Sequence, residues 1–249
     1  MRILYVFPHP DDESYGPARA ISRQRREGHE VYLLTLTRGG ATKQRFKYGY
    51  SIEEMGAVRY KEMLDVAQVL DLTGMTVLDL PDSGLKEMDP REIETAIAAH
   101  IESVQPDVVV TYAVHGISGF FDHLVCHAVV KRAYVELRER APYLKRLAFY
   151  TITEEEAGQA EWVHLTGSKP EDIDVVVPLD EDDLEAMRRA LDCYVTYAAT
   201  VEESGIKRNI PREAVFEIYQ ETHDPPLDGL SYGLTENEEA TEQKTHLLE

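Results

Sequence analysis

Three apolar runs at regular intervals constrain the fold of this chain more than any other feature. Residues 2–7, 30–37 and 107–113 have the sequences RILYVF, EVYLLTLT and DVVVTYA, which are typical of strands buried on both faces of a parallel sheet. Helical spacing is found between and after them, at 14–27, 52–71, 90–104, 122–138 and 180–203. The alternation predicts an α/β fold: a Rossmann-like, doubly wound, mostly parallel sheet with helices on both faces.

Shorter features complete this pattern. Further strands are predicted at 76–80, 146–152 and 173–178. Gly28 stands where the first helix should end, in the left-handed conformation that glycine adopts easily. The polar loop 38–51 is long for a compact domain, and long loops are often functional or mobile.

The length of 249 residues suits one sizeable α/β domain. We expect this domain to span residues 1–205, with an extension packed on it at 206–233. Periodicity is weak after about residue 204. The acidic stretch 234–249 is predicted to be a disordered tail.

Charge and cysteine content exclude several classes of partner. The net charge of −20 would repel nucleic-acid phosphates. No apolar stretch is as long as a membrane span, and the first residues lack the basic region and cleavage site of a signal peptide. Cys126 and Cys193 are too few for a disulfide framework, so we expect a cytoplasmic protein with no membrane or nucleic-acid partner. Homo-oligomerisation is left open.

Polar residues follow three of the predicted strands. They are the segments 8–13 (PHPDDE), 37–39 (TRG) and 115–123 (HGISGFFDH). Ligands bind beyond the carboxyl ends of the strands in an open parallel sheet, so these segments should meet at one rim.

The first of these segments suggests a metal site. His9, Asp11 and Asp12 offer one imidazole and two carboxylates on a turn stiffened by two prolines. Successive carboxylates point in different directions, so one can hold a metal while the other faces the water that the metal activates. A third ligand must come from elsewhere, and His123 or His127 could supply it. The alternative is that Asp12 or Glu13 only caps the following helix.

The segment after the first strand contains no Gly-x-Gly-x-x-Gly pattern, and no Walker-type lysine loop is present. A dinucleotide-binding function, which is common in this class of fold, therefore loses its main support.

Five short motifs resemble one family, over about residues 1–200. They are Pro-His-Pro-Asp-Asp-Glu at 8–13, Thr-x-Gly at 37–39, Arg-x-x-Glu at Arg59 and Glu62, Leu-x-Asp at 80–82, and Asp-His at Asp122 and His123. This combination resembles the LmbE-like, or PIG-L, deacetylases.

The resemblance implies an LmbE-like fold and a zinc-dependent hydrolase that removes an acetyl group from an N-acetylglucosaminyl conjugate. It implies that His9, Asp12 and His123 bind Zn²⁺ and that Asp11 is the general base. This agrees with the chemistry, because zinc lowers the pKa of a coordinated water to about 7 and a nearby carboxylate can accept the proton. Arg59 and Asp82 become candidates for binding the sugar, with a surface ion pair or loop cap as the alternative.

The chain departs from the family pattern at one position of the third segment. The family usually has His-Pro-Asp-His there, whereas this chain has Phe120-Phe121-Asp122-His123, and a phenyl ring cannot donate a proton. His115 is the candidate to replace the missing catalytic histidine, and His127 is interpreted as a packing residue. Two alternatives to sugar deacetylation stay open: hydrolysis of a less polar amide or ester, and zinc binding without catalysis.

Overall fold

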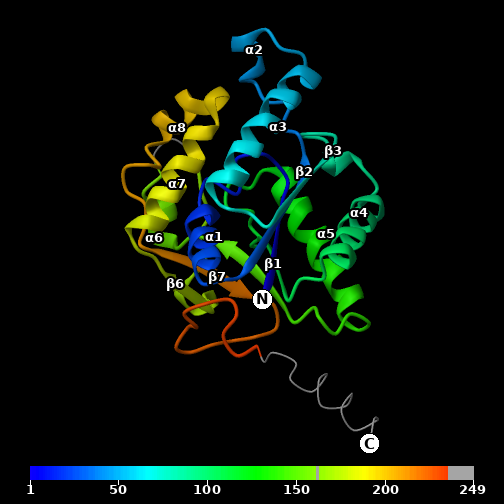
Figure 1. Ribbon diagram of the computed structural model, residues 1–249, viewed down its shortest axis with the longest axis vertical. Coiled ribbons are helices and arrows are strands. Elements are labelled where there is room, and N and C mark those ends of the chain that lie inside the picture. Colours follow the sequence, from blue (N-terminus) through cyan, green and yellow to red (C-terminus); the bar gives the residue numbers. More distant parts are fainter. Residues whose placement is uncertain (161–162, 235–249) are drawn as a thin grey trace, which may run out of the picture.

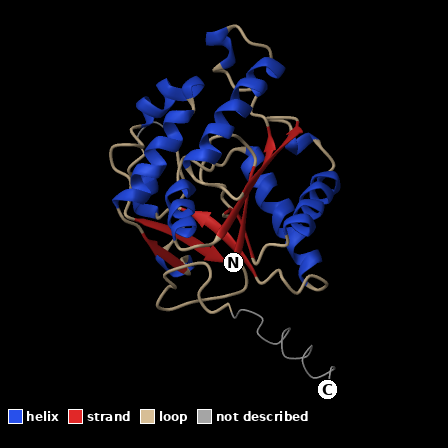
Figure 2. Cartoon of the chain, in the orientation of Figure 1, coloured by secondary structure: helices blue, strands red, loops and turns tan. Residues whose placement is uncertain are grey.

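A mixed seven-stranded sheet forms the centre of the molecule, and helices cover both of its faces (Figures 1 and 2). The computed structural model describes residues 1–160 and 163–234. In chain order the elements are β1 (Arg2–Phe7), α1 (Pro17–Arg26), β2 (Glu30–Thr37), α2 (Arg45–Tyr48), α3 (Ile52–Val69), β3 (Gly74–Leu80), η1 (Leu85–Glu87), α4 (Pro90–Val104), β4 (Val108–Tyr112), α5 (Phe121–Arg138), β5 (Arg146–Thr151), α6 (Glu154–Gly158), η2 (Pro170–Asp172), β6 (Val175–Pro178), α7 (Glu181–Cys193), η3 (Val195–Tyr197), α8 (Ala198–Ser204) and β7 (Glu213–Ile218).

The strand order places β1 at the point where the winding of the sheet reverses. The order is β3-β2-β1-β4-β5-β7-β6. The strands from β3 to β5 are parallel, with Ile3 opposite Val31 on one side and Val108 on the other, and β7 runs antiparallel to both of its neighbours. A crevice is expected beyond the carboxyl ends of β1 and β4, because the chain leaves these two strands towards opposite faces.

Two apolar layers explain why the strands are apolar on both faces. Alternate side chains of β1 point to opposite sides: Ile3, Tyr5 and Phe7 pack with α1, α3 and α7, whereas Leu4 and Val6 pack with α4 and α5. All five are fully buried. The helices of the two layers lie on opposite sides of the sheet in Figure 1.

The predicted fold class is confirmed, and several element boundaries agree closely. The strands at 2–7 and 30–37 and the helix at 90–104 are found as predicted. Gly28 has a φ of +87°, which confirms the left-handed conformation expected there. The first helix begins at Pro17 rather than 14, because the amides of Ser14 and Tyr15 donate to the carbonyl of Asp11 and form a turn instead.

The single helix predicted at 180–203 is wrong, because it breaks at Tyr194 into α7, η3 and α8. Tertiary contacts cause the break. Thr196 donates from its amide and its hydroxyl to the carboxylate of Glu62, both at 2.7 Å. Tyr194 donates to the buried carboxylate of Glu13 at 2.7 Å. Side chains far away in the sequence therefore override the local helical preference.

Several elements in the described ranges were not predicted, among them η1, α6 and η2. The loop 38–51 contains the short helix α2, and the segment 206–233 contributes β7, which lies between β5 and β6 in the sheet itself. Of the tail predicted at 234–249, all but Leu234 lies outside the described residues. No helix in the described part of the chain has the length and apolar character needed to cross a membrane.

Candidate active site

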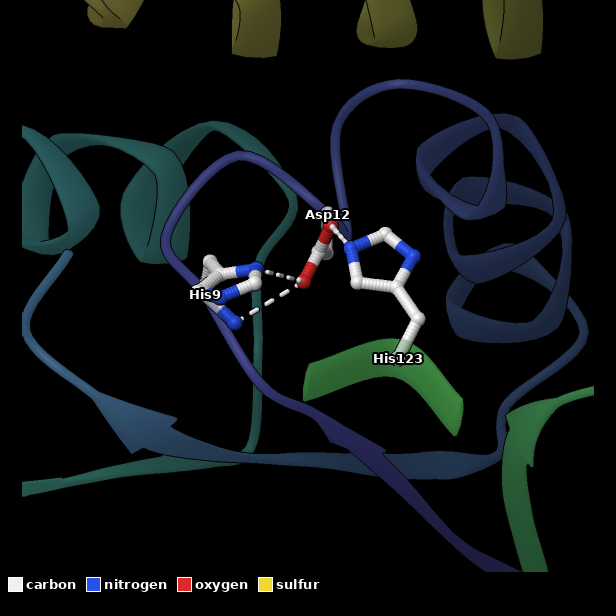
Figure 3. Close-up of side chains that lie close together, drawn as sticks. All are labelled: His9, Asp12 and His123. Carbon is white, nitrogen blue, oxygen red and sulfur yellow. Dashed lines mark hydrogen bonds and ion pairs between the residues drawn. The ribbon is translucent and has the colours of Figure 1, made fainter. Parts of the chain in front are cut away.

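Three predicted metal ligands converge at the carboxyl ends of β1 and β4. His9 and Asp12 lie on the turn after β1, and His123 lies in the first turn of α5. One ligand atom from each residue lies within 4.8 Å of the others. Figure 3 shows the Asp12 carboxylate between the two imidazoles.

The distances within this group suit a tetrahedral cation. Nδ1 of His9 is 3.4 Å from Oδ2 of Asp12, and Nε2 of His123 is 3.3 Å from Oδ1 of Asp12. Two ligands bound to zinc at its usual bond lengths are separated by about 3.4 Å in tetrahedral geometry. Two nitrogens and one carboxylate oxygen are also a common donor set for a catalytic zinc site.

Hydrogen bonds fix the orientation of both imidazoles. Nδ1 of His123 lies 2.9 Å from the carbonyl of Gly116, which selects the tautomer with a free Nε2 lone pair facing Asp12. Nε2 of His9 lies 3.2 Å from Oδ2 of Asp122 and 3.5 Å from Oδ1 of Asp82, so Nδ1 is left to face Asp12. Carboxylate partners of this kind orient metal-binding histidines and increase their basicity.

Asp122 and Asp82 are themselves held in place. The amides of Ser83 and Leu85 donate to Asp122 at 2.8 and 3.3 Å. The amide of Ala41 donates to Oδ2 of Asp82 at 2.6 Å. His9, Asp82 and Asp122 also lie close enough to share a cation, but these backbone donors satisfy the two carboxylates, so we interpret the pair as partners of His9.

The charge balance of the site favours a bound cation. Burial would lower the pKa of His9, yet the carboxylates of Asp12, Asp122 and Asp82 raise it to about 10. Burial also opposes ionisation of Asp12, but His123 and His9 hold the pKa of this carboxyl well below its usual range. Carboxylates that stabilise a protonated imidazole so strongly also stabilise a metal ion that binds the imidazole in place of the proton.

The carboxylate of Asp11 makes different contacts from that of Asp12. Its backbone has a φ of +84°, which few residues other than glycine adopt and which aspartate tolerates better than most. Oδ2 of Asp11 accepts a hydrogen bond of 2.7 Å from Arg59. Burial raises the pKa of Asp11 above its ordinary value, although Arg59 acts in the opposite direction.

Arg59 is buried, so its contact with Asp11 is not a surface ion pair. Besides Asp11, it donates to the carbonyls of Pro10 at 2.7 Å and Gly39 at 3.3 Å. Its guanidinium lies 4.2 Å from the ring centroid of Tyr197. Arg59 therefore ties the turn after β1 to the loop after β2 and holds the Asp11 carboxylate.

The cap alternative for Asp12 and Glu13 does not fit the structure. The N-cap of α1 is Gly16, and no side chain caps this helix. Oδ2 of Asp12 instead accepts a hydrogen bond from the amide of His9 at 2.8 Å, within the turn. The carboxylate of Glu13 is buried and accepts from Ser14 and Tyr194.

The two remaining histidines of this region make other contacts. Nε2 of His115 lies 3.3 Å from the hydroxyls of both Ser168 and Thr151. Within residues 1–160 and 163–234, no hydrogen bond or ion pair joins His115 to the metal-site residues. Nδ1 of His127 bonds the carbonyl of Tyr112 at 2.8 Å, and its ring packs on Phe149, which confirms His127 as a packing residue.

Tyr112 is a site residue that sequence reasoning missed. Its hydroxyl donates to Oδ1 of Asp12 at 2.8 Å, and its ring stacks on His123 with 4.4 Å between centroids. It belongs to no motif. The available signal was its place near the end of the strand predicted at 107–113, next to the rim where the polar segments meet.

The fold and the histidine–carboxylate cluster together define an α/β protein with a candidate metal site at the switch point of its sheet. The family model that matches residues 4–134 is PIG-L, described as GlcNAc-PI de-N-acetylase. It covers more than half of the chain, and the chain belongs to this family.

Two bacterial deacetylases are among the proteins to which the chain is similar. The probable N-acetyl-alpha-D-glucosaminyl L-malate deacetylase 2 of Bacillus subtilis is 29% identical over 164 residues, which is 65% of this chain and 73% of that protein. The 1D-myo-inositol 2-acetamido-2-deoxy-alpha-D-glucopyranoside deacetylase of Rhodococcus opacus is 29% identical over 266 residues, covering 89% and 90%.

Solved structures share the fold at low sequence identity. A deacetylase of teicoplanin biosynthesis has a TM-score of 0.69 at 14% identity, covering 88% of this chain and 98% of that one. The 4-carboxy-2-hydroxymuconate hydratase of Pseudomonas putida has a TM-score of 0.62 at 14% identity, covering 89% and 97%. Because a hydratase shares the fold, the reaction must be argued from the site.

Proposed function

We propose that this chain is a zinc-dependent hydrolase that removes the acetyl group from the nitrogen of an N-acetylglucosaminyl conjugate. One observation carries the proposal: Asp12 lies between two imidazoles, while the carboxylate of Asp11 next to it is held by Arg59. This arrangement separates metal binding from proton transfer. The names of the relatives from Bacillus subtilis and Rhodococcus opacus support the sugar amide as substrate.

His9, Asp12 and His123 would hold the ion. When bound, zinc supplies a Lewis acid that polarises the amide carbonyl and increases the acidity of a water molecule. Three protein ligands leave the open position that a catalytic zinc site requires.

Asp11 moves the proton in this mechanism. Its carboxylate accepts a proton from the water that attacks the amide carbon, and the bond from oxygen to carbon forms. When the carbon–nitrogen bond breaks, Asp11 returns this proton to the departing amine, so the products are acetate and the free amino sugar. Arg59 keeps the carboxylate oriented during both steps.

Arg59 and Asp82 are the two residues predicted to bind the substrate, and their side chains make different contacts. Arg59 is only 2% exposed, and its hydrogen bonds are directed to Asp11, Pro10 and Gly39, so we assign it chiefly to positioning Asp11. Asp82 lies beside His9 with one oxygen bonded to the amide of Ala41. We propose that Oδ1 of Asp82, which lies 3.5 Å from Nε2 of His9, also accepts a hydrogen bond from a sugar hydroxyl.

The test is release of acetate and free amine from methyl N-acetylglucosaminide and from its malate and inositol conjugates. Zinc-loaded protein should turn over at least one of them, and removal of the metal by a chelator should abolish turnover until zinc is added back. A protein that binds zinc and hydrolyses none of these amides would contradict the proposal.

A replacement of His115 tests the catalytic role predicted for this residue. We expect His115→Gln to keep kcat within about threefold of the wild type, because glutamine can bond Thr151 and Ser168 as the imidazole does. Steady-state kinetics on the best amide substrate measure this. A loss of 100-fold or more at unchanged zinc content would restore His115 as a catalytic residue.

Cytoplasmic location, with no nucleic-acid or membrane partner, remains a proposal from composition. Both cysteines are free thiols, and burial raises the pKa of Cys126 to about 12, so this thiol is unreactive at neutral pH. Formation of a homo-oligomer stays open.

A further inference from the structure

Two adjacent phenylalanines are exposed at the start of α5. Phe120 is 59% and Phe121 63% exposed. Phe120 is the N-cap residue of the helix but makes no capping hydrogen bond, although serine, threonine, aspartate or asparagine would stabilise the helix at this position. These exposed rings therefore stand where a polar residue would stabilise the helix better.

The ring of Phe120 lies against a predicted metal ligand. Its centroid is 5.6 Å from that of His123, and the two planes meet at 80°, as in an edge-to-face pair. The apolar surface therefore begins one ring away from the ion that would polarise the substrate amide. A group attached to that amide lies within reach of Phe120.

The loop before α5 holds the two rings in a defined position. Gly116, Ile117 and Gly119 all have positive φ, and +58° is unfavourable for a β-branched residue such as Ile117. The carbonyl of Ile117 accepts a hydrogen bond of 2.8 Å from the amide of Thr166. Backbone strain kept by such contacts is a feature of functional loops.

A lysine side chain lies against the second phenylalanine ring. The ammonium of Lys86, on η1, lies 4.4 Å from the ring centroid of Phe121. The ring of Phe120 therefore lies beside His123, and the ring of Phe121 lies beside a positive charge.

We propose that Phe120 and Phe121 form a subsite for an apolar group of several carbons carried by the amide substrate. The inference rests on the proposed function and makes it more specific, because the preferred substrate would be amphipathic: a sugar with either a longer acyl group or an apolar aglycone. Both sources present the same chemistry to the two rings.

Two substrate series distinguish the sources. One extends the acyl group of methyl glucosaminide from acetyl to hexanoyl, and the other extends the aglycone of N-acetylglucosaminide from methyl to hexyl. With the zinc-loaded full chain, kcat/KM should rise by more than about tenfold along one series, because each of the four or five added methylenes contributes roughly two- to fourfold on transfer from water to an apolar surface. Phe120→Asn and Phe121→Ser should flatten this rise, whereas Phe120→Leu should keep most of it.

These variants are chosen to fold. Asparagine is a favoured N-cap residue, so Phe120→Asn removes the ring without weakening α5. Val135→Ser is the matched control, because Val135 is an exposed apolar residue on the same helix, 38% exposed. It should leave both series unchanged.

Binding of both substrate series to Asp11→Asn, measured by calorimetry, separates the proposed subsite from the proposed deacetylation. Length-dependent binding that requires Phe120, without turnover by the wild type, would support the subsite and contradict the proposed deacetylation. Turnover or binding with no dependence on chain length, or a dependence that survives in both phenylalanine variants, would overturn the subsite. So would a change from dimer to monomer in Phe121→Ser by light scattering, since the rings would then belong to an interface between two copies.

Discussion

Replacement of Asp11 by asparagine should lower kcat by about 10²- to 10⁴-fold and leave the zinc content unchanged. This range is the usual contribution of a positioned general acid–base group. Asn keeps the shape of the side chain and tolerates the φ of +84° at this position, whereas alanine would strain the turn. The loss should therefore come from the missing proton acceptor and not from a displaced backbone.

Stability must be followed in the same experiment. Asp11→Asn leaves the guanidinium of Arg59 buried opposite a neutral amide, and loss of one partner of a buried ion pair costs about 3–5 kcal/mol. Activity is therefore measured well below the unfolding temperature of the variant. Asp79→Asn, at an aspartate whose side chain is 78% exposed, is the control for charge removal and should behave as the wild type.

A small loss of kcat in Asp11→Asn would contradict the role of Asp11 as the general base. If Asp11→Asn keeps more than about a tenth of wild-type kcat with zinc bound, Asp11 is not the group that accepts the proton, because general-base catalysis contributes at least 10²-fold. If zinc is lost as well, the two successive carboxylates share the metal and the separation of roles is wrong.

The convergence of His9, Asp12 and His123 was predictable because it depends on topology. Central parallel strands such as 2–7 and 107–113 are recognisable from apolar runs alone. Once β1 and β4 are neighbours, the turn after β1 and the helix after β4 must meet at the same rim. The sequence motif then only has to supply the correct ligand types.

The positioning contacts were not predictable from local pattern. Arg59 and Asp11 are 48 residues apart, and His9 and Asp122 are 113 apart. Whether Arg59 faces the substrate or Asp11 depends on a shift of a few ångströms in the packing of α3, which periodicity does not specify. The helix break at Tyr194 was also not predictable from local pattern, because long-range hydrogen bonds to Glu13 and Glu62 compete there with helical propensity.

β7 was missed for a different reason. Its sequence EAVFEI is short and follows a stretch without clear periodicity, and its two glutamates obscure the apolar pattern of a strand inside the sheet. Antiparallel pairing with both β5 and β6 is set by the path of the chain after α8. Strand–helix alternation predicts only parallel strands.

Zinc should raise the melting temperature of the wild-type protein by roughly 5–10 °C, and His123→Ala should abolish this rise together with activity. At a free metal concentration 100 times Kd, ligand binding stabilises the folded state by about 2.7 kcal/mol. For a domain of this size, 1 kcal/mol corresponds to a shift of about 2–4 °C. The effect is expected because His123 and His9 contribute the two nitrogen ligands on either side of Asp12.

Two further variants make the metal prediction specific. Asp122→Asn keeps all three ligands but weakens the hydrogen bond that orients His9, so Kd for zinc should rise about 10–100-fold and the thermal shift should shrink without vanishing. His127 lies one helical turn after His123, and His127→Gln perturbs only packing. This variant should lower the melting temperature of the metal-free protein and retain the full shift on adding zinc. If His123→Ala keeps the shift and His127→Gln loses it, the ion binds through a histidine that the proposed mechanism does not use, because Nδ1 of His127 is bonded to the carbonyl of Tyr112.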